Sequence, residues 1–426
     1  MAEQSKQAAT AGLRGAYWDA DRVPADVRLT VHPLRTQDGN VVSGYLLARG
    51  GETTVAVLAH PREHIVANYL AAEILQTGAA VFLQAPRLVG NDIRLEHEIA
   101  LYDLAAAMRF LRGAGFAHIV PVGNSGGGPL WAFYNQQALA APGQRIALAP
   151  GGRPTGLAQA DLPVPDALVF VSTHLGQGKL LMNALDPSVV DEMDALSVDP
   201  ELDPFSAANG YRRGGASYSA DFVSRYRQAQ VSRVARLDAQ ARAQVAERTA
   251  ARAKLKDGDD RAARIRAAHT PIFPVWRTDA DLRCWDLGLD PSERRFGSLW
   301  GADPLASNYG SIGFGRVCTA ESWLSTWSGL SSNASMQACA PAIEQPTLFI
   351  EYTGDPATFP EDNAAMFDWI GTGQKQRLAF KGDHQGRPIA EGDPDCRPAV
   401  GVAIGEWFGD VLPTSSARQP HEGTPA

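Results

Sequence analysis

The chain has 426 residues, which is too long for one simple hydrophobic core and indicates one large domain with an insertion, or two domains. Its 45% hydrophobic and 20% charged residues are typical of a soluble globular protein. A net charge of -8 argues against a nucleic-acid partner, and no apolar run reaches the length of a membrane span. We therefore expect neither a nucleic-acid-binding protein nor a membrane protein.

The N-terminus predicts the compartment, and the compartment predicts the state of the cysteines. Residues 1–15 lack the basic start and apolar core of a secretory signal, so we expect a cytoplasmic location. The four cysteines have no CxxC spacing, which argues against a zinc site, and in a reducing compartment we expect free thiols. They are Cys284, Cys318, Cys339 and Cys396.

The first part of the chain, after a polar and partly disordered leader (1–24), alternates between strands and helices. Two alternating segments, 27–35 and 41–47, flank an Asp-Gly pair and predict an antiparallel hairpin. Short apolar runs and amphipathic helices then alternate, as in parallel βαβ units with helices on both faces of a buried sheet. Strands are expected at 54–59, 80–83, just before residue 124 and at 166–172, and helices at 65–76, 96–112 and 129–139.

The segment 120–131 predicts a strand, a sharp turn and a helix. Its G-N-S-G-G sequence at 123–127 matches G-x-S-x-G, which places a serine on a strained strand-to-helix turn. Ser125 is therefore a candidate nucleophile, and the N–H of Gly126 is a candidate donor to an oxyanion. Pro121 conflicts with a central strand because it removes a ladder donor. Either the sheet is irregular there or the strand begins later.

The alternation stops over 175–340, a span that predicts an inserted, mainly helical cap. A helical piece is expected at 179–185, and a long helix is expected at 220–253 or as far as 268. The apolar stripe of the long helix could form a homodimer seam. Its many arginines are expected to pair with acidic residues, among them Asp221, Asp238 and Glu247.

The second half of the cap holds five of the nine tryptophans. Aromatic side chains at this density form a small core or line an apolar pocket. We expect most of them in a core and one or two facing a substrate. The glycine-rich segment 307–315 predicts a loop, which could lie over the site. The candidate substrate-binding residues here are Trp276, Trp300, Tyr309 and Trp323.

After the cap the core pattern resumes and supplies partners for Ser125. A serine needs a base, and the base needs an acid, in the chain order Ser, acid, His for this kind of turn. Asp355 follows a predicted strand and His384 follows the last one, so we expect them to be acid and base. Asp186 is the alternative acid, and Asp383 is expected to be a loop residue. Strands are expected at 346–352 and 376–380, helices at 361–370 and 399–412, and a disordered tail at 413–426.

With Ser125, Asp355 and His384 in this order, the chain resembles α/β-hydrolases of the carboxylesterase type over residues 25–174 and 341–412. The resemblance implies the α/β-hydrolase fold, Ser125 as nucleophile, His384 as general base and then acid, Asp355 as orienting acid, and Gly126 as one oxyanion donor. Many members have His-Gly after the third strand, where this chain has His60-Pro61-Arg62. Pro61 has no N–H, so the second donor would be Arg62 or a neighbour.

Three residues near the serine are further candidates for substrate binding: His60, Arg62 and Asn124. The Arg62 guanidinium could hold a substrate carboxylate in a bidentate pair. The alternative is a structural ion pair with Glu63, Glu96 or Glu98.

The sequence as a whole predicts an ester or lactone hydrolase that forms an acyl-enzyme on Ser125. The aromatic cap favours a small-molecule substrate of moderate size and apolar character. The mechanism requires no metal and no organic cofactor. Two alternatives stay open: a C–C bond hydrolase acting on a β-diketone or ring-fission product with the same triad, and a catalytically silent hydrolase-fold binding protein.

Overall fold

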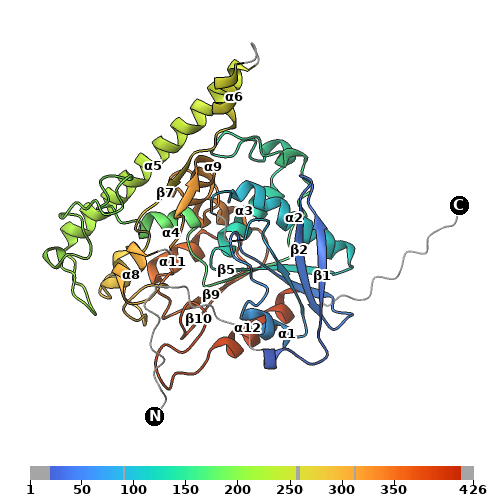
Figure 1. The fold of residues 1–426 in the computed structure, drawn as a ribbon. Coiled ribbons are helices and arrows are strands. Elements are labelled where there is room, and N and C mark those ends of the chain that lie inside the picture. The colour runs from blue at the N-terminus through green and yellow to red at the C-terminus, as the bar shows by residue number, and fades with distance from the viewer. Residues whose placement is uncertain (1–19, 90–91, 256–259, 311–312, 414–426) are drawn as a thin grey trace.

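The computed structural model describes residues 20–89, 92–255, 260–310 and 313–413 (Figure 1). Its centre is an eight-stranded sheet in the order β1-β2-β4-β3-β5-β6-β9-β10. β2 is antiparallel to β1 and β4, and all other neighbours are parallel. The strands are β1 (Arg28–Arg35), β2 (Val41–Ala48), β3 (Thr54–Ala59), β4 (Ala80–Gln84), β5 (His118–Asn124), β6 (Leu168–Val171), β9 (Thr347–Tyr352) and β10 (Lys375–Phe380).

Alternation along the strands divides the apolar side chains between two cores. In β3, Val55 and Val57 belong to the cluster with α2 and α3, whereas Ala56 and Leu58 belong to the cluster with α1 and α12. Figure 1 shows these helix pairs on opposite sides of the sheet. The predicted fold class, α/β-hydrolase, is confirmed. The helices around the sheet are α1 (Leu70–Leu75), α2 (His97–Gly113), α3 (Gly127–Leu139), α11 (Pro360–Trp369) and α12 (Arg397–Val411).

Pro121 lies inside β5 without interrupting the sheet. It pairs in register with Val57 of β3. The N–H groups of Ile119 and Ser125 both point toward the β6 side, donating to Asp166 Oδ2 and Val171 O. By alternation the Pro121 nitrogen faces the same side, where β6 begins only at Leu168. The strand therefore neither begins late nor becomes irregular, because the missing N–H of Pro121 faces the first residue of β6.

The helix predicted at 65–76 is shorter than expected. It begins at Leu70, whose N–H donates to the Asn68 side chain at 2.9 Å. The residues from His60 to Tyr69 therefore form a loop at the carboxyl end of β3. Several of them line the cavity described below.

The chain leaves the sheet after β6 and returns at β9, and the segment 175–340 between them is called the cap here. Its regular elements are mainly helices, but it also contains a two-stranded antiparallel sheet that the sequence did not predict. Residues 307–309 of the predicted glycine-rich loop belong to a helix, and residues 311–312 lie outside the described residues. The cap elements are α4 (Gln177–Ala184), α5 (Ala220–Lys254), α6 (Arg261–Ala268), β7 (Ile272–Pro274), α7 (Leu282–Trp285), α8 (Pro304–Tyr309), β8 (Val317–Thr319), α9 (Ala320–Ser322), the π-helical turn η5 (Trp323–Trp327) and α10 (Met336–Cys339).

The long helix α5 runs along the edge of the molecule (Figure 1). Its extension to residue 268 is wrong, because the Asp260 side chain caps α6 as a separate helix. The apolar stripe, including Val234 and Leu237, is buried against the rest of the same chain. Much of the stripe is therefore occupied within one chain, and a homodimer through the cap helix stays a prediction. Most arginines of α5 pair with acids as predicted, for example Arg225 with Asp221 at 3.1 Å and Arg242 with Asp238 at 4.0 Å. The ion pairs of the described residues include none of Glu247.

All four cysteines are buried and have free thiols, as predicted. Within the ranges described above, no helix is long and apolar enough to cross a membrane. The same residues contain no group of three or more His, Cys, Asp or Glu side chains that could hold a metal ion. Most of the predicted leader and tail, residues 1–19 and 414–426, lies outside the described residues.

Candidate active site

Ser125 lies at the turn between β5 and α3 in a strained backbone conformation, with φ at +53°. A Cβ on Gly123 would come within 2.6 Å of the Gly128 Cα. A Cβ on Gly127 would come within 2.3 Å of the carbonyl oxygen of Ala59. Gly123 is therefore required by the close approach of β5 and α3, and Gly127 by the close approach of α3 to the end of β3. The turn holds the serine side chain at the carboxyl edge of the sheet.

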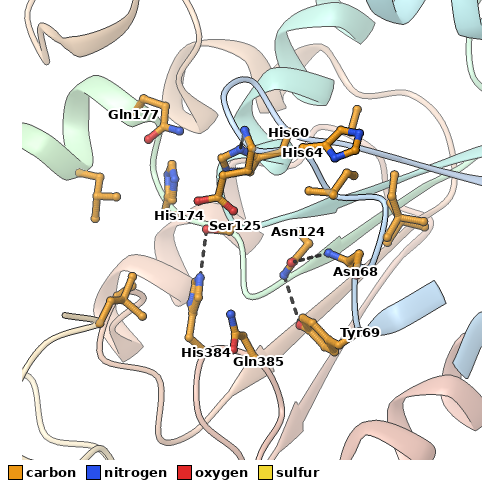
Figure 2. A pocket seen from close by; sticks show the side chains of 18 of the residues that line it. His60, His64, Asn68, Tyr69, Asn124, Ser125, His174, Gln177, His384 and Gln385 are labelled. Atoms are coloured by element: carbon orange, nitrogen blue, oxygen red, sulfur yellow. Dashed lines mark hydrogen bonds between the residues drawn. The ribbon is translucent and has the colours of Figure 1, made fainter. Parts of the chain in front are cut away.

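A hydrogen-bonded chain connects Ser125 to the two partners predicted from the sequence, and Figure 2 shows its first link, between Ser125 and His384. The Ser125 Oγ lies 3.0 Å from Nε2 of His384. Nδ1 of the same ring lies 2.8 Å from Oδ2 of Asp355. With its Nδ1–H donated to the carboxylate, the ring presents Nε2 as an acceptor for the serine hydroxyl. This is the arrangement that general-base activation of a hydroxyl requires.

The Asp355 carboxylate is fully buried and is held as an anion by its surroundings. Its Oδ1 accepts the N–H of Ala357 at 2.7 Å, and its Oδ2 accepts the hydroxyl of Thr358 at 2.9 Å. Ser172 donates a further short hydrogen bond to Oδ2. Burial raises the pKa of Asp355, but the His384 ring and these hydrogen bonds outweigh it and hold the pKa below the ordinary value.

The Asp355 anion acts in turn on His384. Burial lowers the pKa of the His384 ring, but attraction by the adjacent Asp355 carboxylate is stronger and holds its pKa above the ordinary value. The Asp355 carboxylate therefore stabilises the imidazolium that forms when the His384 ring takes a proton from the serine.

Ser172 is a site residue that the sequence reasoning missed. It follows β6 with φ at +49°. Its Oγ lies 2.9 Å from Nδ1 of His384 and also forms the hydrogen bond to Oδ2 of Asp355. An αL serine directly after a buried strand has no distinguishing sequence pattern. Its position beside Ser125 arises only because β5 and β6 are neighbours in the sheet.

The alternative acids are occupied elsewhere. Asp186 lies in the cap and forms a buried ion pair with Arg277 at 3.2 Å. It is therefore not a partner for His384, and that alternative is wrong. Asp383 pairs with Arg387 at 2.8 Å and is the loop residue that the sequence predicted.

Ser125 opens into a cavity of about 230 Å³ between the core and the cap. Its apolar walls come from both parts of the chain and include Leu58, Ile65, Leu180, Leu299 and Phe314. Its polar lining includes His60, Glu63, Asn68, Asn124, His174, Gln177 and Gln385. Figure 2 shows His60, His174 and Gln177 on one side of Ser125 and Asn124 on another.

The four aromatic candidates from the cap do not line this cavity. Trp323 is buried and donates to Asp238 at 2.8 Å, and Trp276 donates to the carbonyl of Glu192. Trp300 packs edge to face against the lining residue Phe314, and Tyr309 accepts a hydrogen bond from Arg277. The prediction that they contact substrate is wrong for this cavity, because their side chains contact other residues of the cap.

Arg62 is also displaced from its predicted roles. Its guanidinium forms a bidentate pair with Asp92, at 2.9 Å for both contacts, and lies over the Trp327 ring. Its backbone N–H points to Nδ1 of His60 at 3.3 Å. Arg62 is therefore neither the second oxyanion donor nor an anchor for a substrate carboxylate. The predicted ion pair exists, but with Asp92 and not with Glu63, Glu96 or Glu98.

His60 and Asn124 do lie at the cavity, as predicted. Asn124 donates to the carbonyl of Val171 at 3.0 Å and to the Tyr69 hydroxyl at 3.3 Å, which fixes its amide beside Ser125. His60 and the neighbouring His174 are both buried, and burial lowers the pKa of each, to about 3 for His174. Both rings are therefore neutral near pH 7, and the cavity gains no positive charge from them.

Comparisons with known proteins give only distant likenesses. No protein-family model and no curated protein matches the chain. DcsB, solved with a substrate analogue, is 15% identical, with 90% of this chain and 99% of that one covered and a TM-score of 0.46. The esterase domain of a Rhodothermus marinus protein is 12% identical (89% and 98% covered, TM-score 0.43). An esterase from Pyrococcus furiosus is 9% identical (95% and 100% covered, TM-score 0.42).

Proposed function

We propose that the protein is a serine hydrolase that cleaves a carboxylic ester or lactone through an acyl-enzyme on Ser125. The observation that carries this proposal is the continuous hydrogen-bonded chain from Ser125 Oγ through His384 to the buried Asp355 anion. A binding protein without catalytic activity would not need a serine at φ +53° that contacts a base, or a buried carboxylate behind that base. That strain and burial are typical of a nucleophile under selection for reactivity.

In the proposed reaction, His384 removes the Ser125 proton as the oxygen attacks the substrate carbonyl. The negative charge that develops on the carbonyl oxygen is stabilised by the N–H of Gly126 at the start of α3. The same imidazolium then protonates the leaving alcohol, and the neutral ring activates water to release the acid. Asp355 remains ionised throughout and holds the ring in orientation.

The cavity indicates the kind of ester that fits. Its volume of about 230 Å³ is small, so a compact acyl or alcohol group is expected at the site. Apolar side chains from the core and the cap line it together with polar groups, of which Glu63 carries a negative charge. We therefore propose small, uncharged and partly apolar esters or lactones as substrates.

Glu63 is expected to make the site discriminate against anionic esters. Among the described residues that line the cavity, it is the one Asp, Glu, Lys or Arg side chain. Its negative charge acts to raise the pKa of both His60 and His384. One added like-charge contact of about 1 kcal/mol or more would lower kcat/KM at least about fivefold. Glu63→Gln should lower the ratio of kcat/KM for a neutral ester to kcat/KM for its carboxylate-bearing isostere. Both esters are assayed with the same variant. Glu344→Gln, the same charge change at the amino end of β9, should leave the ratio as it is. A ratio that Glu63→Gln does not change would exclude this role.

The proposal is tested by rapid mixing with an activated aryl ester. An acyl-enzyme mechanism predicts a burst of aryl alcohol equal to the concentration of active sites, followed by a slower steady rate. Intact-mass analysis of quenched samples should show the acyl group added to the protein. Turnover of the ester with no covalent species at any time would contradict an acyl-enzyme.

A further inference from the structure

The backbone directly after β3 offers no free N–H at residues 61–63, the positions expected to supply the second oxyanion donor. Pro61 has no N–H, and the N–H groups of Arg62 and Glu63 both point to Nδ1 of His60, at 3.3 Å and 3.1 Å. At these three positions the backbone donor is therefore absent or occupied. An oxyanion generally requires more than the single N–H that Gly126 provides.

The same contacts fix the tautomer of His60. An Nδ1 that accepts two backbone N–H groups carries no proton of its own. The ring is buried, and burial lowers its pKa, so it is neutral near pH 7. Its one proton is consequently on Nε2, which can only donate.

That Nε2 is directed at the nucleophile turn. It lies 2.8 Å from the position that a Cβ on Gly126 would occupy, directly beside the first oxyanion donor. His60 also lines the cavity into which Ser125 opens (Figure 2). The hydrogen bonds of the described residues include none from this nitrogen, so the N–H is available to a substrate atom.

We propose that the Nε2–H of His60 is the second donor of the oxyanion hole, an inference that rests on the acyl transfer proposed above. As the bond from Ser125 Oγ to the carbonyl carbon forms, the electron pair of the C=O moves to oxygen and His384 takes the serine proton. His60 keeps its own proton and stabilises the new anion with a hydrogen bond. The backbone donors that many such sites use directly are used here to orient a side-chain donor.

Gln177 is the competing candidate, because its Nε2 lies 2.6 Å from the same Gly126 Cβ position. Its Oε1 is buried and has no partner among the described residues. A free amide can present either its oxygen or its nitrogen to the cavity. His60 can present only a donor, and this favours it over Gln177.

Two substitutions separate the two nitrogens of His60. In His60→Asn the side-chain oxygen can replace Nδ1 as acceptor for the loop, but nothing reaches the Nε2 position. In His60→Gln the amide nitrogen can reach the Nε2 position, but the loop acceptor is lost. The measurements are kcat, KM, the Ki of a trifluoromethyl ketone that forms a tetrahedral adduct, and the thermal midpoint. His118→Asn, at the opposite end of β5 from Ser125, is the matched control.

We expect His60→Asn to lower kcat by about 10²- to 10³-fold with KM within a few-fold, the cost of removing one oxyanion donor. The Ki of the ketone should rise in parallel, the thermal midpoint should stay close to that of the native protein, and His60→Gln should recover part of kcat. Equal losses in both variants, or a kcat in His60→Asn within fivefold of the native value, would overturn the inference. A larger loss in Gln177→Leu than in His60→Asn would assign the donor to Gln177 instead. A burst of acyl-enzyme in His60→Asn would show that the acyl-transfer proposal stands on its own.

Discussion

Replacing Ser125 with alanine is expected to lower kcat by about 10⁶-fold, the scale observed when the nucleophile of a serine triad is removed. The substitution keeps a Cβ, so the strained backbone at φ +53° is no worse accommodated than before. Only the hydroxyl and its hydrogen bond to His384 are lost. The measurement is kcat for the same aryl ester, with the thermal midpoint as a check of folding.

The control for this change is Ser217→Ala, a serine on an exposed part of the cap. It should retain native activity. If Ser125→Ala retained more than about 1% of the native kcat, attack by Ser125 could not be the route of the reaction.

Asp355→Asn is expected to lower kcat by about 10⁴-fold with a much smaller effect on KM. The asparagine amide would donate to Nδ1 of His384 and so favour the tautomer with its proton on Nε2. That tautomer cannot accept the Ser125 proton. The measurement is kcat across the pH range, together with the thermal midpoint.

Asp383→Asn is the matched control for Asp355→Asn, because Asp383 adjoins His384 in sequence but pairs with Arg387. It should change kcat by less than tenfold. Similar losses in the two variants would show that general negative charge near His384 matters, and not the hydrogen bond from Asp355.

The nucleophile turn and its partners could be predicted because their chemistry constrains the sequence directly. Gly123 and Gly127 are required by backbone contacts shorter than any Cβ allows, and this requirement is visible as a local pattern. Asp355 and His384 are far from Ser125 in sequence. They could still be found, because parallel strands bring their carboxyl ends to one edge of the sheet.

The residues that complete the site could not be predicted in the same way. The role of His60 depends on which ring nitrogen the loop occupies, and that depends on the orientation of Arg62 and Glu63. Pro61 did indicate a missing backbone donor, but not which side chain replaces it. Arg62 pairs with Asp92, a residue thirty positions away whose contact depends on the path of a loop.

Most of the cap tryptophans lie in buried clusters, as predicted, among them Trp285, Trp323 and Trp327. The prediction that one or two face a substrate was wrong for a related reason. An aromatic side chain satisfies a core and a pocket equally well by composition, and only packing distinguishes them. Trp323 is fixed in the core by its hydrogen bond to Asp238 of α5. The cap residues that line the cavity are instead Leu180, Leu299 and Phe314. They are far apart in the sequence, and no motif connects them.

The central claim, that Ser125 is the nucleophile, is tested most directly with a fluorophosphonate probe. The native protein should gain one probe mass, and peptide mapping should place it on Ser125. The Ser125→Ala variant should gain none under the same conditions. An active native protein that stays unlabelled, or that is labelled at another residue with Ser125 unmodified, would contradict the proposed function.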